Sequence, residues 1–251
     1  MQLDLKDRVV CVTGSARRVG RAIALGFAQE GAHLVIHHHA SPEEAAGAAE
    51  EACSYGVDAL VVSADQSDPA TVERLFCAIR AHYGRLDVMV NSAAGFKHTP
   101  LLDVTFSEWQ AVLGVNLTGP FLCTQQATRL MIDGGQGGAI INISDNSGLN
   151  PWPARPHHSI SKAGVIMLTQ VAALALAEHN IRVNCIVPGP VLRPAGEPEG
   201  VLDAIAQGLP LKRIGQPQDI ARACVFLARN DYATGAILRV DGGEGLAGRE
   251  T

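Results

Sequence analysis

The chain has 251 residues, of which 47% are hydrophobic and 18% charged, and its 25 acidic and 20 basic side chains give a net charge of −5. This composition is typical of a compact globular protein, and the length suits one domain, residues 1–251, with a sheet covered on both faces. The acidic balance and the lack of a basic run or of about 18 consecutive apolar residues predict no nucleic-acid and no membrane partner. The amino terminus lacks the pattern of a signal peptide, so we expect a cytoplasmic protein.

Short β-branched runs alternate with helical stretches along the chain, which predicts an α/β protein with a parallel sheet, right-handed crossovers and helices on both faces. The predicted strands are 8–12, 33–37, 58–63, 86–91, 138–144, 182–187 and 237–240. The predicted helices are 18–30, 42–55, 69–83, 107–132, 157–179 and 217–228.

Two segments point beyond this simple alternation. Residues 188–210 are rich in proline and glycine. Long irregular segments in compact domains are usually lids or binding loops, so we expect a substrate lid there, with a passive surface loop as the alternative. The predicted helix 157–179 is apolar nearly all round between residues 165 and 177. Part of it should therefore face another subunit, and we expect a homo-oligomer.

A glycine-containing turn follows the first predicted strand. Residues 13–20 read Thr-Gly-Ser-Ala-Arg-Arg-Val-Gly and open the first helix. In that context, backbone amides and the positive end of the helix bind a pyrophosphate. Gly14 permits the tight turn, and we expect Gly20 to let the helix approach the sheet. Arg18 replaces one of the usual three glycines, and could grip phosphates or the substrate.

The end of the second predicted strand indicates which nicotinamide cofactor is used. A site that prefers NAD usually carries a carboxylate there, whereas residues 37–41 read His-His-His-Ala-Ser, with no acid. Arg17, His39 and Ser41 could instead surround a 2′-phosphate, so we expect NADPH (NADP+), with NADH less favoured. Adjacent side chains on a strand face opposite ways, so the three histidines predict no metal site.

Further landmarks follow later strands, namely Asp65, where a side chain can reach an adenine, Asn91 in Asn-Ser-Ala-Ala-Gly, Asn116 in GVNLTGPF, Pro188-Gly189 and Asp241-Gly-Gly. With these landmarks in order, the chain resembles the short-chain dehydrogenase/reductase family over nearly its whole length. The resemblance implies a single-domain Rossmann fold with a seven-stranded sheet, a homotetramer or homodimer, and a small-molecule substrate. The expected cofactor-binding residues are Gly14, Arg17, Arg18, Val19, Gly20, His39, Ser41, Asp65, Gln66, Asn91, Ala93, Lys162, Pro188 and Gly189.

The proton-transfer residues are the unusual part of the chain. In the wider family, a serine and a tyrosine hydrogen-bond the substrate oxygen, a lysine lowers the pKa of the tyrosine and holds the nicotinamide ribose, and a helical asparagine completes a proton relay. By this resemblance Lys162 and Asn116 match, whereas Asp145 occupies the serine position and His158 the tyrosine position. These four residues are the expected catalytic set.

One subgroup shares some of these changes. Pteridine reductases resemble this chain in having Arg18 for a glycine, Phe96 after the fourth strand and Asp145 in the serine position. The resemblance implies that Phe96 stacks on a pterin and that Asp145 supplies a proton to a ring nitrogen, although Ala94 and His158 depart from the subgroup. Ordinary packing is the alternative for Phe96. The candidate substrate residues are Phe96, Arg18, Trp152 and Arg193, with Arg155 as a further one.

Histidine can donate a proton near neutral pH without the help that tyrosine needs. The leading hypothesis is therefore an NADPH-dependent reductase that transfers hydride to a C=N bond of a pterin-like or cyclic imine substrate. The alternatives are a carbonyl or alcohol oxidoreductase that uses His158 as acid and base, an enzyme of elimination or isomerisation, and a non-catalytic NADP(H)-binding scaffold or sensor. His157 is an alternative working group, although it points about 100° away around the helix.

Overall fold

The seven strands of the protein form one parallel sheet, in the order β3-β2-β1-β4-β5-β6-β7. This computed structural model describes residues 3–192 and 200–247. The strands are β1 (Val9–Val12), β2 (His33–His38), β3 (Ala59–Ser63), β4 (Val88–Asn91), β5 (Gly138–Ile143), β6 (Ile181–Pro188) and β7 (Ile237–Val240). The predicted seven-stranded α/β fold is confirmed. The strand order reverses between β1 and β4, where open α/β sheets bind their ligands.

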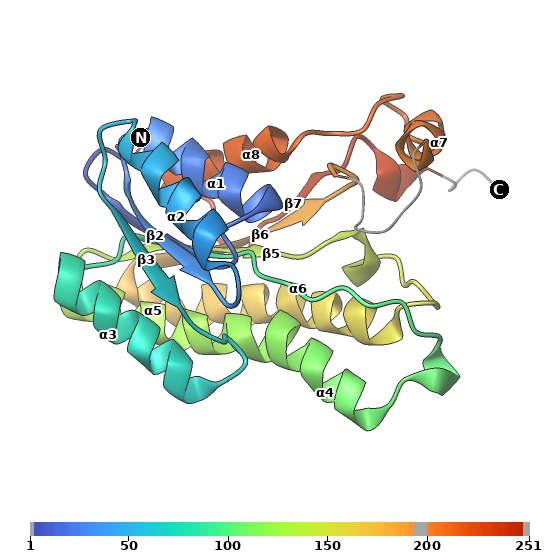
Figure 1. The fold of residues 1–251 in the computed structure, drawn as a ribbon, viewed down its shortest axis with the longest axis horizontal. Helices are drawn as coiled ribbons and strands as arrows, with labels where there is room; N and C mark the ends of the chain where they lie inside the picture. The colour runs from blue at the N-terminus through green and yellow to red at the C-terminus, as the bar shows by residue number, and fades with distance from the viewer. Residues whose placement is uncertain (1–2, 193–199, 248–251) are drawn as a thin grey trace.

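Helices cover both faces of the sheet, so the molecule has three layers (Figure 1). Helices α1, α2 and α8 lie on one face, and α3, α5 and α6 on the other, with α4 packed against α6. The described helices are α1 (Arg18–Gln29), α2 (Pro42–Cys53), α3 (Pro69–Tyr83), α4 (Phe106–Leu113), α5 (Gly119–Gly134), α6 (Pro156–Leu176), α7 (Val201–Gly208) and α8 (Pro217–Arg229). Helix α7 falls within the segment 188–210, which is therefore not irregular throughout, and whose residues 193–199 lie outside the described part of the chain.

One predicted helix contains a π-helical segment. The expected helix 107–132 is helical without a break from Phe106 to Gly134, but the π-helical segment Gly114–Thr118 divides it into α4 and α5, which we did not predict. The helix passes close to the loop after β3 here, since a Cβ atom on Gly119 would lie 2.7 Å from Cγ of Gln66. Apolar periodicity does not distinguish such a segment from a continuous helix, because a single π turn shifts the pattern by only one residue.

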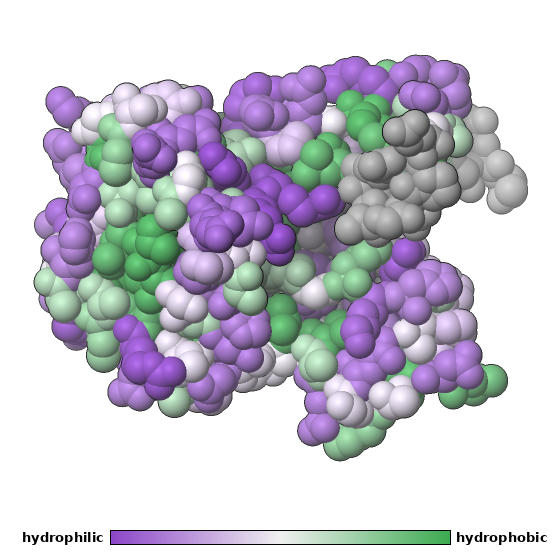
Figure 2. All heavy atoms as spheres, viewed as in Figure 1, coloured by the Kyte–Doolittle hydropathy of each residue, from purple (hydrophilic) through white to green (hydrophobic). Residues whose placement is uncertain are grey.

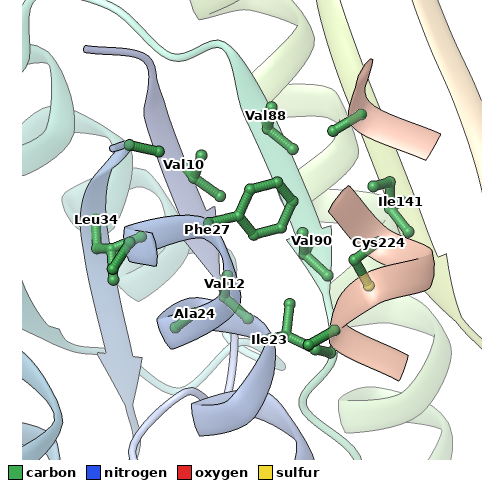
Figure 3. Packing of buried hydrophobic residues seen from close by; sticks show 14 of the residues in the cluster. Val10, Val12, Ile23, Ala24, Phe27, Leu34, Val88, Val90, Ile141 and Cys224 are labelled. Atoms are coloured by element: carbon green, nitrogen blue, oxygen red, sulfur yellow. The ribbon is translucent and has the colours of Figure 1, made fainter. Parts of the chain in front are cut away.

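The core forms because each central strand is buried on both faces. Val10 and Val12 of β1 pack with α1 and α8, whereas Val9 and Cys11 of the same strand pack on the opposite face with α3 and α5. Figure 3 shows Phe27 of α1 pointing from its helix toward the valines of β1 and β4. A sheet held in this way fixes the carboxyl ends of its strands, from which the site is built.

Helix α6 carries two of the expected catalytic residues and an apolar outer face. Residues Pro156–His179 are long and apolar enough, by composition, to cross a membrane, which the sequence analysis did not anticipate. In the fold this segment packs against β6, and its first turns bury His158 and Lys162, so it is a core helix. Its outer face exposes Ile160, Met167, Val171 and Leu174.

Candidate active site

The turn after β1 depends on two glycines. Gly14 has φ +67°, a left-handed conformation that glycine adopts without strain. A Cβ atom on Gly20 would lie 2.2 Å from the carbonyl oxygen of Gly14. Gly20 therefore lets helix α1 approach this turn, rather than the sheet as we predicted. Arg18 also has a positive φ, 55°, at the position where it replaces a glycine.

His37 holds this turn in place and was not among the predicted site residues. Its Nδ1 accepts a hydrogen bond from the Gly14 amide at 3.0 Å, and its Nε2 lies 3.0 Å from the carbonyl oxygen of Ala64. Nε2 must therefore carry the proton. Burial lowers the pKa of His37 to about 4, so the imidazole is neutral at physiological pH. The only sequence signal for this role was its place at the end of β2, beside the turn.

A cavity of about 450 Å³ opens beside the turn. Of the predicted cofactor residues, it is lined by Gly14, Arg17, Arg18, Val19, Gly20, His39, Ser41, Asp65, Gln66 and Ala93. The backbone of the turn, the amino end of α1 and this cavity fit a dinucleotide. Across residues 3–192 and 200–247, no group of three His, Cys, Asp or Glu side chains is placed to hold a metal ion.

Asn91 lies at the carboxyl end of β4, as predicted, with its side chain buried. Its Nδ2 donates to Oδ1 of Asn142 at 2.8 Å and to Oγ1 of Thr124 at 3.2 Å. The amide nitrogen thus joins β4 to β5 and α5, while Oδ1 has no hydrogen-bond partner within the described chain, and contact of Asn91 with a cofactor stays a prediction.

Pro188 and Gly189 lie at the carboxyl end of β6, against the turn that follows β7. A Cβ atom on Gly189 would lie 2.6 Å from Cα of Asp241, so this close approach requires glycine. The Asp241 carboxylate accepts hydrogen bonds from the Gly243 and Gly245 amides, each at 2.9 Å. Packing accounts for both landmarks, and contact of Pro188 and Gly189 with a cofactor stays a prediction.

The residues predicted to surround a 2′-phosphate lie around the same cavity, in different settings. Arg17 is exposed and pairs with Glu44 at 3.4 Å, which the sequence analysis did not foresee. His39 is exposed, whereas Ser41 is buried and its amide donates to Nδ1 of His38 at 3.3 Å. A phosphate bound here would compete with Glu44 for the Arg17 guanidinium.

At the other end of the site, Asp145 and His158 form a hydrogen-bonded pair. Oδ2 of Asp145, just beyond β5, lies 2.5 Å from Nε2 of His158 in α6. The other carboxylate oxygen, Oδ1, accepts from the amide of Ser147 at 2.9 Å and from its hydroxyl at 2.5 Å. The His158 side chain is 3% exposed and that of Asp145 21%, so only the aspartate side of the pair is open to solvent.

Electrostatics keep the Asp145 carboxyl ionised. Burial acts to raise its pKa, but the hydrogen bond from His158 and the charge of Lys162 outweigh burial, and the net pKa is lowered. Burial lowers the pKa of Lys162, while the charge of Asp145 acts in the opposite direction. Nζ of Lys162 donates to the carbonyl oxygen of Ile143 at 2.9 Å. Since a carboxylate only accepts, Nε2 of His158 carries the proton between the two groups.

Asn116 lies against His158, and its expected role in a relay to Lys162 stays a prediction. It lies in the π-helical segment, and its carboxamide exchanges two hydrogen bonds with the backbone of Gly95, at 2.7 and 3.0 Å. Its Nδ2 also lies 3.2 Å from Nδ1 of His158. The structure therefore places the amide directly against the imidazole.

Aromatic side chains and an arginine surround His158. The Phe96 ring meets the imidazole edge-on, with centroids 4.9 Å apart, and the Trp152 ring lies nearly parallel to it at 6.3 Å. Cζ of Arg155 lies 4.3 Å from the Phe96 centroid, so one face of that ring is covered. Phe96 is 47% exposed, and its stacking on a substrate stays a prediction. Arg193 lies outside the described residues.

Two other titratable groups lie near the pair. Burial, with the charges of Asp241 and Asp145, raises the pKa of Glu244, which sequence reasoning missed. His157 is fully buried, lies 3.4 Å from Glu108, and has no hydrogen-bond partner for either ring nitrogen within the described chain. The residue that meets Asp145 is thus His158 and not its neighbour.

The surface is open on this side of the molecule. Figure 2 shows it hollowed between the part that contains α7 and the part that contains α4. A hollow of this size leaves room for a small molecule to approach this side of the molecule from solvent.

Comparison with known proteins identifies the family. A family profile described as "Enoyl-(Acyl carrier protein) reductase" matches residues 14–244. L-rhamnose 1-dehydrogenase (NAD(P)(+)) of Azotobacter vinelandii is 38% identical over 249 residues, which cover 95% of this chain and 97% of that protein. A short-chain type dehydrogenase/reductase of Picea abies is 36% identical over 257 residues, covering 96% and 93%. The crystal structure of acetoin dehydrogenase from Enterobacter cloacae matches with a TM-score of 0.90 and 32% identity, covering 97% and 98%.

The chain belongs to the short-chain dehydrogenase/reductase family. It is accordingly an oxidoreductase of that type, a family whose members use nicotinamide cofactors. The finer resemblance to pteridine reductases, and the preference for NADPH, stay predictions.

Proposed function

We propose that this protein is an NADP(H)-dependent oxidoreductase that interconverts a carbonyl and an alcohol group of a small molecule, with His158 as its acid and base and Asp145 as the carboxylate that orients it. The contact of 2.5 Å between these two side chains carries the proposal. An imidazole bonded to an ionised carboxylate is held in place to act as a general acid and base. Similarity to dehydrogenases of rhamnose and acetoin supports a carbonyl or alcohol substrate over the imine that we first predicted.

Different residues bind the cofactor and transfer the proton. The turn of residues 13–20 and the amino end of α1 would hold the pyrophosphate, and Lys162 the nicotinamide ribose, as the family resemblance implies. The bound nicotinamide supplies or accepts the hydride. In the reducing direction, the Nε2–H bond of a protonated His158 breaks, its electron pair stays on nitrogen, and the proton forms the hydroxyl of the product. The Asp145 carboxylate orients the His158 imidazole. The charges of Asp145 and Lys162 offset the change in charge on the imidazole when it gives up its proton.

The preference for NADPH is part of the proposal. Arg17 and His39 are exposed at the cavity next to Ser41, and no acidic residue ends β2. An arginine and an imidazole stabilise the negative charge of a 2′-phosphate. NADH has no such phosphate, so with NADH bound Arg17 would stay paired with Glu44.

Reduction of a C=N bond in a pterin-like or cyclic imine substrate is the second candidate. The observation that favours it is Asp145 itself, because the carboxylate can accept the Nε2 proton of His158 and pass it to a ring nitrogen. Phe96, half exposed beside His158, provides a ring on which a planar substrate could stack.

We also propose that the protein is a homotetramer or homodimer in the cytoplasm. The exposed apolar side chains of α6 (Ile160, Met167, Val171 and Leu174) support an assembly that covers this helix. Size-exclusion chromatography with light scattering tests this, and a monomer at micromolar concentration would refute it.

The test of function is cofactor turnover against a substrate panel at several pH values. The panel contains aldoses, acetoin and simple ketones with NADPH, their alcohols with NADP+, and dihydropterins and cyclic imines. Turnover of carbonyl or alcohol members supports the first proposal, and turnover of pterins or imines alone supports the second.

The variant His158→Tyr is measured alongside. Activity that appears only in this variant, with tight NADPH binding by the unchanged protein, would show that the histidine has ended hydride transfer. The protein would then be a non-catalytic NADP(H)-binding protein.

A further inference from the structure

The second ring nitrogen of His158 faces two groups of opposite character. Nδ1 lies 3.2 Å from Nδ2 of Asn116 and 3.3 Å from the carbonyl oxygen of Gly95. The orientation of the Asn116 carboxamide is fixed, because its Oδ1 accepts the Gly95 amide at 2.7 Å. Nδ2 is thus a donor and the Gly95 carbonyl an acceptor, so Nδ1 has a partner whether or not it carries a proton.

Both side-chain amide hydrogens of Asn116 have acceptors, whether or not Nδ1 of His158 carries a proton. Its Nδ2 carries two hydrogens and has three partners, the Gly95 carbonyl at 3.0 Å, the Ser161 hydroxyl at 3.2 Å and Nδ1 of His158 at 3.2 Å. The Ser161 hydroxyl donates to the carbonyl oxygen of His158 at 2.7 Å, which leaves its lone pairs to accept. When Nδ1 is bare, one hydrogen of Asn116 bonds to it. When Nδ1 carries a proton, both hydrogens bond to Gly95 and Ser161.

We propose that Asn116 and the Gly95 carbonyl form a tautomer switch, in which Asn116 positions His158 with Nδ1 bare at rest and Gly95 holds the Nδ1 proton during catalysis. At rest, the proton on Nε2 bonds to Asp145. To reduce a substrate, the imidazole first takes up a solvent proton on Nδ1 and becomes imidazolium, with Nδ1–H bonded to Gly95. After His158 gives its Nε2 proton to a substrate oxygen, the imidazole is neutral with its remaining proton on Nδ1. The role in catalysis rests on the proposed function, whereas the resting tautomer does not.

Neither change needs movement of the buried ring. Phe96 and Trp152 pack against the imidazole, so a flip of the ring would disturb both. Because Nδ1 lies beside both a donor and an acceptor, the imidazole can change its protonation without rotating. The charged and titratable groups around His158 are Asp145, Lys162, His157, Arg155 on Phe96, and Glu244 near Asp145.

The test is nitrogen NMR of the full chain labelled with ¹⁵N-histidine, recorded across pH without substrate. The His158 signals are assigned among the nine histidines by their loss in His158→Gln. We expect the neutral imidazole to carry its proton on Nε2. A neutral imidazole with the proton on Nδ1 in the unchanged protein would overturn the proposal, whether or not the protein is active.

The variants Asn116→Ala and Asn116→Asp remove the donor to Nδ1, and the aspartate keeps the oxygen that accepts from Gly95. Because the bare Nδ1 then loses its partner, the neutral form with Nε2–H is destabilised. We expect a measurable Nδ1–H population in both variants and a rise of about one pH unit in the His158 midpoint. The aspartate variant should rise more, because its charge favours imidazolium. Ser161→Ala is the matched control, since it removes a competing acceptor of Asn116, and it should keep the resting tautomer.

Turnover separates this inference from the proposed function. An active enzyme whose Asn116 variants shift the acid limb of the pH–rate profile as the NMR midpoint shifts supports the switch and its catalytic role. An inactive protein with the expected tautomer contradicts the proposed function and leaves the resting state as inferred. An unchanged tautomer and midpoint in folded Asn116→Asp would overturn the switch.

Discussion

At the nucleotide end of the cleft the geometry depends on the backbone, whereas at the chemical end it depends on side chains that meet from distant segments. The turn at Gly14 and Gly20 needs a left-handed conformation and an approach that no Cβ atom would permit. Asp145 and His158, in contrast, lie 13 residues apart in the chain and meet through their side chains, where the resemblance predicts a serine and a tyrosine. Backbone constraints tolerate few substitutions, while a side-chain pair can change both members and keep a proton between them.

The largest expected effect tests the chemical end. Replacing Asp145 with Ala leaves buried His158 without its carboxylate and should lower kcat about a thousandfold. NADPH affinity, measured by fluorescence titration, should change less than threefold, because Asp145 does not line the cofactor cavity. Unchanged turnover would remove Asp145 from the mechanism. Ser147→Ala, which removes one bond to the carboxylate, should have a much smaller effect.

The next prediction concerns the histidine at the nucleotide end. The pKa of His37 is lowered from 6.5 to about 4, so the unfolded chain binds this proton more tightly. The contribution to stability is complete above pH 6.5 and is lost as the pH falls toward 4, to a total of about 3 kcal/mol.

Urea denaturation at pH 7 and at pH 4.5 measures this effect. The variant His37→Gln should show a weaker pH dependence than the unchanged protein, whereas His179→Gln, a change at an exposed position, should not. Equal pH dependence in the unchanged protein and His37→Gln would contradict a neutral, structural His37.

A smaller effect tests the backbone constraint directly. Gly20→Ala places a Cβ atom 2.2 Å from the Gly14 carbonyl oxygen, so the turn must shift. We expect a loss of about 2 kcal/mol in unfolding free energy and at least tenfold weaker NADPH binding. Gly47→Ala in α2, where nothing lies within 4 Å, is the control and should stabilise the protein by about 0.5–1 kcal/mol. Normal NADPH affinity in Gly20→Ala would show that the turn adapts.

The smallest predicted effect concerns cofactor choice. Arg17→Ala should weaken NADPH binding about tenfold and leave NADH binding nearly unchanged, because only NADPH carries the 2′-phosphate. Arg21→Ala is the matched control, because it removes an arginine of α1 that pairs with Glu51 of α2. Equal losses for both cofactors would place Arg17 on the pyrophosphate instead.

Much of the nucleotide end could be predicted from the sequence, because strand ends and glycine positions follow from local patterns. Gly14, residues 16–20 and Asp65 line one cavity. Asn91 is the exception, since its position on β4 was right but its amide points into the core. Periodicity gives the position of a residue on a strand, whereas the direction of a polar side chain at a strand end depends on neighbouring elements.

The sequence by itself determined the parallel α/β fold and the glycine turn, because both follow from local periodicity and from the common edge of parallel strands. The meeting of Asp145, His158 and Lys162 was expected only from the resemblance to the family. Only the tertiary structure decided that His37 holds the turn and that Asn116 bonds to His158. These contacts join residues that lie 23 and 42 positions apart. They depend on how helices pack on the sheet and on the π-helical segment that carries Asn116, and neither leaves a signal in the apolar pattern of the chain.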